Sequence, residues 1–262
     1  MIYEDFTKEN EKMSKRLHII DEYRGLVVLN MVLYHAIWDL VFMFGNDWYW
    51  FIEERQGWRI WIGGSFILIS GFCWQMSRNP MKRGLLVYLC GVIVSAVTLL
   101  FTPDAKIIFG VLTLLGSSML LMIPFDLVFQ KIHPIIGIVV SVAVFFLTFG
   151  VNKGYFGFGE VKLMDVPEEW YANGFTTYLG FPESGFFSAD YYTIFPWFFL
   201  FMTGYFLYSL YAKYKTKKVE KVLKASICPP LGWVGRHALI IYMIHQPVIY
   251  GGLLLLQKVL EL

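Results

Sequence analysis

The residues of this chain that are best suited to chemistry interrupt its first long apolar stretch, residues 16–45. They are the ionisable residues Asp21, Arg24, His35 and Asp39. At about 100° per residue, a helix places these side chains on one stripe about 60° wide, with Asn30 on the opposite side. Ionisable groups are costly inside a membrane and commonly mark a functional site. The stripe therefore predicts a polar site along this helix, and a purely structural cluster that holds helices together is the alternative.

His35 lies near the middle of this stretch, and Asp39 follows it by one helical turn. A carboxylate at this spacing can accept a hydrogen bond from one imidazole nitrogen and fix the tautomer. The other nitrogen is then available as a base or nucleophile, as in acyl-transfer sites. Arg24 precedes His35 by about 16 Å of helix, and its guanidinium could hold a phosphate. We therefore predict His35 and Asp39 as catalytic residues and Arg24, with Asp21, as ligand-binding residues.

A second polar group occurs in the last apolar stretch, residues 231–255. Arg236 and His237 lie near its start, and His245 and Gln246 lie about two turns further along. Pro247 removes a backbone donor and so frees a carbonyl group inside the helix. His245 and Gln246 are candidates for substrate binding, and satisfying that interrupted backbone is the equal alternative. Arg236 and His245 face opposite sides of a regular helix.

The elements that must position these residues are membrane helices. Of the 262 residues, 57% are hydrophobic and only 16% are charged, and the apolar runs are long enough to cross a bilayer. The fold class is therefore an all-α, polytopic membrane helical bundle with about seven transmembrane helices. A cytosolic segment, residues 1–17, precedes a single transmembrane domain, 18–255, and a short tail, 256–262. The predicted spans are 18–44, 58–77, 84–101, 107–124, 134–151, 192–212 and 231–255.

The distribution of Lys and Arg predicts the orientation of this bundle. With the N-terminus in the cytosol, the inner segments hold 14 of these residues and the outer segments hold 6. This asymmetry follows the positive-inside rule and places the C-terminus on the extracytoplasmic side. The Lys-rich stretch 213–224 is then expected to meet anionic lipid headgroups. Because the dense Lys cluster adjoins membrane helices, nucleic acid is not an expected partner.

One connection, residues 152–190, is a long outer loop rich in Gly, aromatic and acidic residues. Its aromatic content is too high for a disordered tail, so we expect it to fold over the outer mouth of the bundle. Asp190, at its end, suits a helix N-cap and is also a candidate for binding a sugar hydroxyl. The three cysteines have neither a metal-ligand spacing nor a disulfide pattern, and no metal site is expected.

Several short motifs follow one another along the chain in a fixed order. They are Asp21-Glu22-Tyr23-Arg24-Gly25, the run from Asn30 to Leu40, Ile108-Phe109-Gly110-Val111-Leu112, Asp190-Tyr191 with Pro196-Trp197, and Gly235-Arg236-His237 with Tyr242 and His245-Gln246-Pro247. This series resembles the catalytic domain of the heparan-alpha-glucosaminide N-acetyltransferase family, most closely its small bacterial members, from about residue 16 to 255. The spacing of Arg24 and His35 is also similar to that in membrane O-acyltransferases of bacterial polysaccharides.

The resemblance implies a reaction and a location. The reaction is the transfer of an acetyl group from cytosolic acetyl-CoA to an amino sugar or polysaccharide on the extracytoplasmic side. The location is the bacterial cytoplasmic membrane, with membrane lipid around the helices. By the resemblance, acetyl-CoA would be bound by Arg24, Asp21, Arg236 and His237. The acceptor would be bound by Trp38, Asp190, His245 and Gln246.

Two other classes of function compete with an acyltransferase. A small transporter could use the charged stripe to conduct protons or a solute, but such proteins often show inverted repeats. An odd number of spans and no visible internal repeat count against this class. A non-catalytic polysaccharide-export partner would keep the fold without the chemistry, and the complete set of Arg24, His35 and Asp39 argues against it. Aromatic outer faces are compatible with a homodimer.

Overall fold

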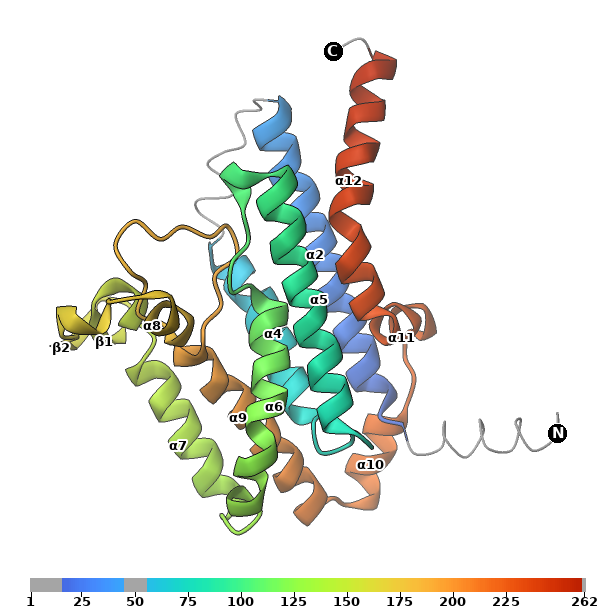
Figure 1. The fold of residues 1–262 in the computed structure, drawn as a ribbon. Coiled ribbons are helices and arrows are strands. Elements are labelled where there is room, and N and C mark those ends of the chain that lie inside the picture. The colour runs from blue at the N-terminus through green and yellow to red at the C-terminus, as the bar shows by residue number, and fades with distance from the viewer. Residues whose placement is uncertain (1–15, 45–55, 261–262) are drawn as a thin grey trace. The chain divides into compact units, whose positions relative to one another are not determined.

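The structure is a computed structural model that describes residues 16–44 and 56–260 (Figure 1). The described part is mainly helical, as the sequence predicts, and the all-α membrane fold class is confirmed. The helices are α2 (His18–Phe44), α4 (Gln56–Phe72), α5 (Pro80–Phe101), α6 (Val111–Phe129), α7 (Pro134–Leu147), α8 (Gly174–Leu179), α9 (Ile194–Tyr214), α10 (Lys217–Lys224), α11 (Pro229–Arg236) and α12 (Ala238–Leu260). A short hairpin pairs β1 (Tyr155–Phe158) with β2 (Val161–Asp165). Most of the predicted N-terminal segment, residues 1–17, lies outside the described residues.

The predicted spans correspond to helices with two differences. Within residues 16–44 and 56–260, six helices are long and apolar enough to cross a membrane: α2, α5, α6, α7, α9 and α12. The predicted second span corresponds to α4, which has 17 residues in the described part. The predicted last span is not one continuous helix, because α11 ends at Arg236 and α12 begins at Ala238. The sequence placed an opening of this helix at Pro247, but the break lies at His237 and α12 continues through Pro247.

The direction of the first and last spans bears on the number of crossings. Glu22 contacts Ile227, and Asp39 contacts Gln246, so α2 and the α11–α12 segment run in the same direction. Two spans that cross in the same direction are separated by an odd number of other crossings. Four of the candidate spans lie between α2 and α12, and α4 would be the fifth. The parallel arrangement thus supports the seven predicted spans, and the side on which each end lies stays a prediction.

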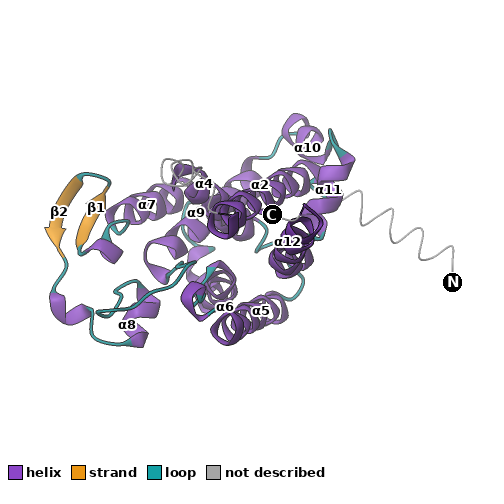
Figure 2. Ribbon diagram, turned by 90° about the horizontal axis from the view of Figure 1, so that it is seen from above, coloured by secondary structure: helices purple, strands orange, loops and turns teal. Residues whose placement is uncertain are grey.

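The chain divides into two compact units, residues 1–66 with 214–262, and residues 67–213. In the first unit, α2 contacts α10, α11 and α12, and Figure 2 shows these helices grouped together. The start of α4 lies against the opposite side of α2. There the Trp58 indole donates to Asn30 Oδ1 at 3.2 Å, and the Tyr23 and Ser65 hydroxyls are 3.0 Å apart. The two-sided character that helical periodicity predicts for α2 is therefore confirmed.

The contact between α2 and α11 depends on two glycines. A Cβ atom at Gly25 would lie 1.9 Å from the carbonyl oxygen of Leu231. A Cβ atom at Gly235 would lie 1.8 Å from the carbonyl oxygen of Asp21. The backbones of the two helices touch because neither residue has a side chain, a pattern typical of membrane helix contacts. We therefore expect this contact to set the register between the polar residues of α2 and those of α11 and α12.

The second unit contains the long loop and its supporting helices. Residues 152–190 form the β1–β2 hairpin and α8 rather than an unstructured tail. Val151, Val166 and Phe181 form a buried core for this region, and the Trp170 ring packs edge-on against Phe181 at 5.2 Å. The prediction that the loop is folded is confirmed. Its position over the outer mouth of the bundle stays a prediction.

Candidate active site

Two imidazole rings from separate helices face one another in the first unit. His35 of α2 and His245 of α12 have ring centroids 4.9 Å apart, with their planes inclined by 59°. His245 is buried, whereas His35 is only partly buried. Tyr34 lies edge-on to His35 at 5.8 Å, and Tyr242 lies 5.4 Å from His245. The sequence predicted a catalytic role for His35 and a substrate-binding role for His245, and the structure brings the two residues together.

The tautomer of His245 follows from its backbone contact. Its Nδ1 atom lies 2.6 Å from the carbonyl oxygen of Tyr242. A carbonyl oxygen only accepts hydrogen bonds, so Nδ1 carries the proton and donates it. In the neutral ring, Nε2 then holds a lone pair. That atom is buried and has no hydrogen-bond partner among the described residues. Since buried polar atoms are nearly always paired, Nε2 is suited to accept a hydrogen bond or a proton from a bound molecule.

Asp39 contacts a different residue from the one predicted. Both of its carboxylate oxygens accept from Gln246 Nε2 at 2.9 Å, and Asp39 is only 3% exposed. The predicted hydrogen bond from His35 to Asp39 is not present among the described contacts, and that part of the prediction is wrong. The physical reason is that α12 brings an amide donor to the carboxylate and an imidazole to His35. The Oε1 atom of Gln246 is buried and has no hydrogen-bond partner among the described residues. It is a second unpaired acceptor, in the residue that directly follows His245.

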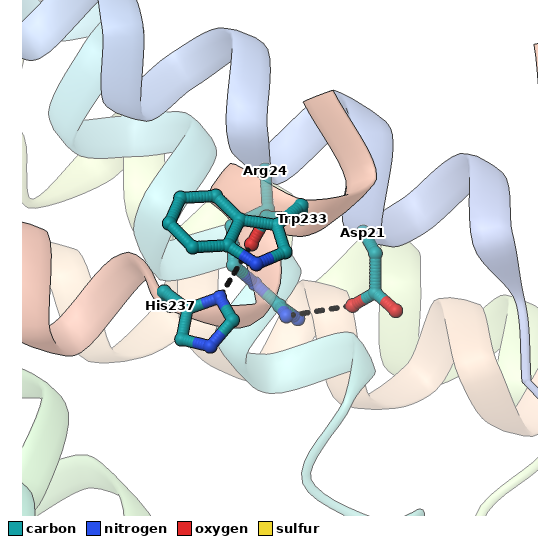
Figure 3. A network of polar contacts seen from close by, with 4 residues as sticks. All are labelled: Asp21, Arg24, Trp233 and His237. Carbon is teal, nitrogen blue, oxygen red and sulfur yellow. Dashed lines mark hydrogen bonds and ion pairs between the residues drawn. The ribbon is translucent and has the colours of Figure 1, made fainter. Parts of the chain in front are cut away.

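A second polar cluster lies near the start of α2 (Figure 3). Arg24 forms an ion pair with Asp21 at 3.0 Å. His237 Nδ1 donates to the carbonyl oxygen of Trp233 at 2.8 Å, and the two rings pack with centroids 4.4 Å apart. Figure 3 shows these four residues gathered at one place, where α2 meets α11. Three of the four residues that were predicted to bind acetyl-CoA are thus brought together.

Trp233 is the member of this cluster that the sequence did not single out. It lies four residues before His237 and is 55% exposed. In a membrane sequence, a tryptophan near the end of a span is typical of the aromatic belt, so its type and position give no separate signal. Its proximity to Arg24 becomes visible only when α2 and α11 are placed together.

The remaining predicted site residues are less closely grouped. Arg236 is exposed at the end of α11, and Trp38 is partly buried on α2. Asp190 belongs to the second unit, where its carboxylate accepts from the backbone N–H of Val111 at 3.1 Å. It therefore caps the start of α6 from a distant part of the chain. The predicted N-cap position is wrong, because Asp190 lies four residues before Ile194, where α9 begins, and its carboxylate instead binds the first backbone N–H of α6.

A comparison with protein families agrees with this arrangement. The family model described as "Heparan-alpha-glucosaminide N-acetyltransferase, catalytic" matches residues 16–247, which include both polar clusters. No curated protein and no solved structure matches the chain. The match covers most of the sequence and, with the six apolar helices, shows a multi-pass membrane protein. The chain therefore belongs to the heparan-alpha-glucosaminide N-acetyltransferase catalytic family, which is a family of membrane acyltransferases.

Proposed function

We propose that this protein transfers an acetyl group from acetyl-CoA, bound at the cytosolic end of α2, to an amino sugar or glycan at the extracytoplasmic side. The observation that carries the proposal is the pair of imidazoles, His35 and His245, at 4.9 Å. Along α2, Arg24 lies about 16 Å before His35, a distance that an extended pantetheine arm spans. A donor whose phosphates lie near Arg24 would thus present its thioester to the histidine pair.

In the proposed reaction, His245 is the general base. Its Nε2 atom accepts a proton from the acceptor amine or hydroxyl as that group attacks the thioester carbon. A C–N or C–O bond forms, the C–S bond breaks, and the proton passes to the departing CoA thiolate. The carbonyl of Tyr242 orients His245, so the base is aligned without a carboxylate.

His35 has a complementary role in this proposal. A neutral imidazole N–H can donate to the thioester oxygen as negative charge develops there, which stabilises the transition state. Asp39 is a positioning residue, because it holds the Gln246 amide beside His245. This arrangement favours direct transfer, since no carboxylate among the described contacts activates His35 as a nucleophile.

The first prediction compares wild type with His35→Ala and Arg24→Ala in purified protein with labelled acetyl-CoA and an amino-sugar acceptor. We expect His35→Ala to lower turnover by about 10²-fold or more, as for loss of an oxyanion donor, and to leave acetyl-CoA binding intact. We expect Arg24→Ala to raise the Kd for acetyl-CoA about tenfold, because a charge-assisted phosphate contact is lost. Turnover in detergent and calorimetric titration measure the two effects.

Two results would change this assignment. Label retained on wild-type protein and absent from His35→Ala would replace direct transfer by an acetyl-histidine intermediate. If acetyl-CoA neither binds nor turns over with any amino-sugar acceptor, the transferase proposal fails, and the charged stripe is better explained as a solute path.

A second prediction concerns the exposed ring of Trp233, on which the adenine of acetyl-CoA would stack. Base–aromatic stacking contributes about 1–3 kcal/mol, so Trp233→Ala should raise the KM for acetyl-CoA roughly tenfold. Acetyl-phosphopantetheine, which lacks the adenosine portion, should show the same KM with wild type and variant. Steady-state kinetics with both donors measures this difference. Trp170→Ala, at another exposed tryptophan, is the matched control, and an equal loss with both donors would contradict the stacking role.

A further inference from the structure

The short helix α10 has two chemically distinct faces. Its sequence is KKVEKVLK. At about 100° per residue, Lys217, Lys221 and Lys224 fall within about 60° of one another. On the same projection, Val219, Val222 and Leu223 occupy an arc about 100° wide on the other side. A helix with this division is typical of segments that lie in the plane of a membrane interface.

Local interactions stabilise α10 as a helix. The Thr216 hydroxyl accepts from the backbone N–H of Val219 at 3.3 Å and caps its start. Lys224 and Glu220 form an ion pair at 2.8 Å, one turn apart. Even so, Val219 is 44% exposed and Val222 is 54% exposed. The apolar face therefore remains largely uncovered by the described residues.

Both ends of α10 lie where membrane spans end. At one end, only Lys215 and Thr216 separate α10 from α9. At the other end, the buried Glu22 carboxylate of α2 accepts from the Ser226 hydroxyl at 2.6 Å and from the Ile227 N–H at 3.0 Å. Because Glu22 lies near the start of the α2 span, this contact places the end of α10 at the level where the span begins (Figure 1).

We propose that α10 is an interfacial helix that binds the anionic surface of the lipid bilayer. Val219 and Val222 enter the boundary between headgroups and acyl chains, together with Ile227, which is 77% exposed just beyond the helix. The lysines on the other face contact lipid phosphates, since juxtamembrane lysines are attracted to anionic leaflets. Through Glu22, this binding holds the start of α2 at the membrane surface. The proposal does not depend on the acetyl-transfer reaction.

The depth of α10 can be measured with spin labels on the full-length chain. Nitroxides would be attached in Val222→Cys and, as the matched control, in Lys221→Cys, after Cys73, Cys90 and Cys228 are replaced by serine. The protein would be placed in nanodiscs of phosphatidylcholine with phosphatidylglycerol. We expect the label at position 222 to collide with oxygen and to be shielded from a nickel chelate, and the label at 221 to show the reverse. Shielding of position 222 from both reagents, or its exposure to nickel, would overturn the proposal.

A charge variant with the native cysteines gives an independent test. It combines Lys217→Gln, Lys218→Gln, Lys221→Gln and Lys224→Gln. We expect the preference of the protein for spin-labelled phosphatidylglycerol over phosphatidylcholine to fall by at least about fivefold, the contribution of one lysine at an anionic surface. The same change at Lys106, Lys153, Lys162 and Lys258 is the control and should leave the preference unchanged. An unchanged preference in the α10 variant would refute the role of its lysines.

Discussion

Replacement of His245 by alanine is expected to lower the turnover of acetyl-CoA by about 10²–10⁴-fold, the contribution of a positioned general base. The Nε2 lone pair of His245 is a buried acceptor in a ring that lies 4.9 Å from the His35 ring, and it is lost in this variant. The donor cluster at Arg24 is unchanged, so the Kd for acetyl-CoA should stay at the wild-type value. Single-turnover kinetics separates the chemical step from donor binding.

A base and a structural histidine can be distinguished by chemical rescue. Added imidazole should restore part of the activity of His245→Ala, because it can occupy the space left by the side chain and accept the proton. The matched control is His237→Ala, which also removes an imidazole whose Nδ1 donates to a carbonyl four residues earlier. This variant should change the KM for acetyl-CoA and gain nothing from imidazole. A His245→Ala protein that melts at a lower temperature and is not rescued would show that His245 serves only packing.

The sequence was sufficient to predict features that depend on a single helix. The positions of Asp21, Arg24 and His35 repeat at intervals close to 3.6 residues, so their common face follows from helix geometry alone. The same geometry placed Asn30 on the other side, where it accepts from Trp58. Length and hydropathy likewise define the apolar spans without any knowledge of their neighbours.

Features that depend on the register between two helices could not be predicted in this way. The pairing of His35 with His245, and of Asp39 with Gln246, requires α12 to lie beside α2 at one particular height. Asp190 was expected to cap the helix that follows it, yet its carboxylate reaches the start of α6. In these cases the hydrogen-bond or ring partner lies far away in the sequence, so the spacing of residues within one helix cannot predict it.

Pro247 shows the same limitation for a backbone feature. It was expected to open the last helix near His245, but α12 continues through it from Ala238 to Leu260. The interruption lies instead at His237, directly after the glycine contact between α2 and α11. The break thus lies beside the close packing against α2, not at the proline. A membrane helix can continue through a proline when neighbouring groups satisfy the freed carbonyl.

Substitution of either contact glycine is expected to have the largest effect on stability. In Gly25→Ala and Gly235→Ala the new methyl group would lie within 2 Å of a backbone carbonyl oxygen, at 1.9 and 1.8 Å respectively. A backbone atom cannot rotate away as a side chain can, so α2 and α11 must separate. We expect a loss of about 3 kcal/mol or more, or a decrease in Tm of roughly 6 °C or more, by differential scanning fluorimetry of the purified protein.

The control variants are Gly251→Ala and Gly252→Ala in α12, where an added Cβ atom meets nothing within 4 Å. These should leave Tm unchanged or raise it slightly, because alanine is favoured over glycine in a helix by about 1 kcal/mol. A Gly235→Ala protein as stable as these controls would show that the helices can separate without cost.

The glycine variants also test whether this contact sets the register of the active site. His237 alone separates α11 from α12, so a displacement of α11 carries His245 away from His35. Gly235→Ala should therefore lose turnover even at temperatures where the protein is fully folded. A variant that is only destabilised would keep wild-type activity below its melting transition. Full activity in the folded fraction of Gly235→Ala would mean that another contact holds the two imidazoles together.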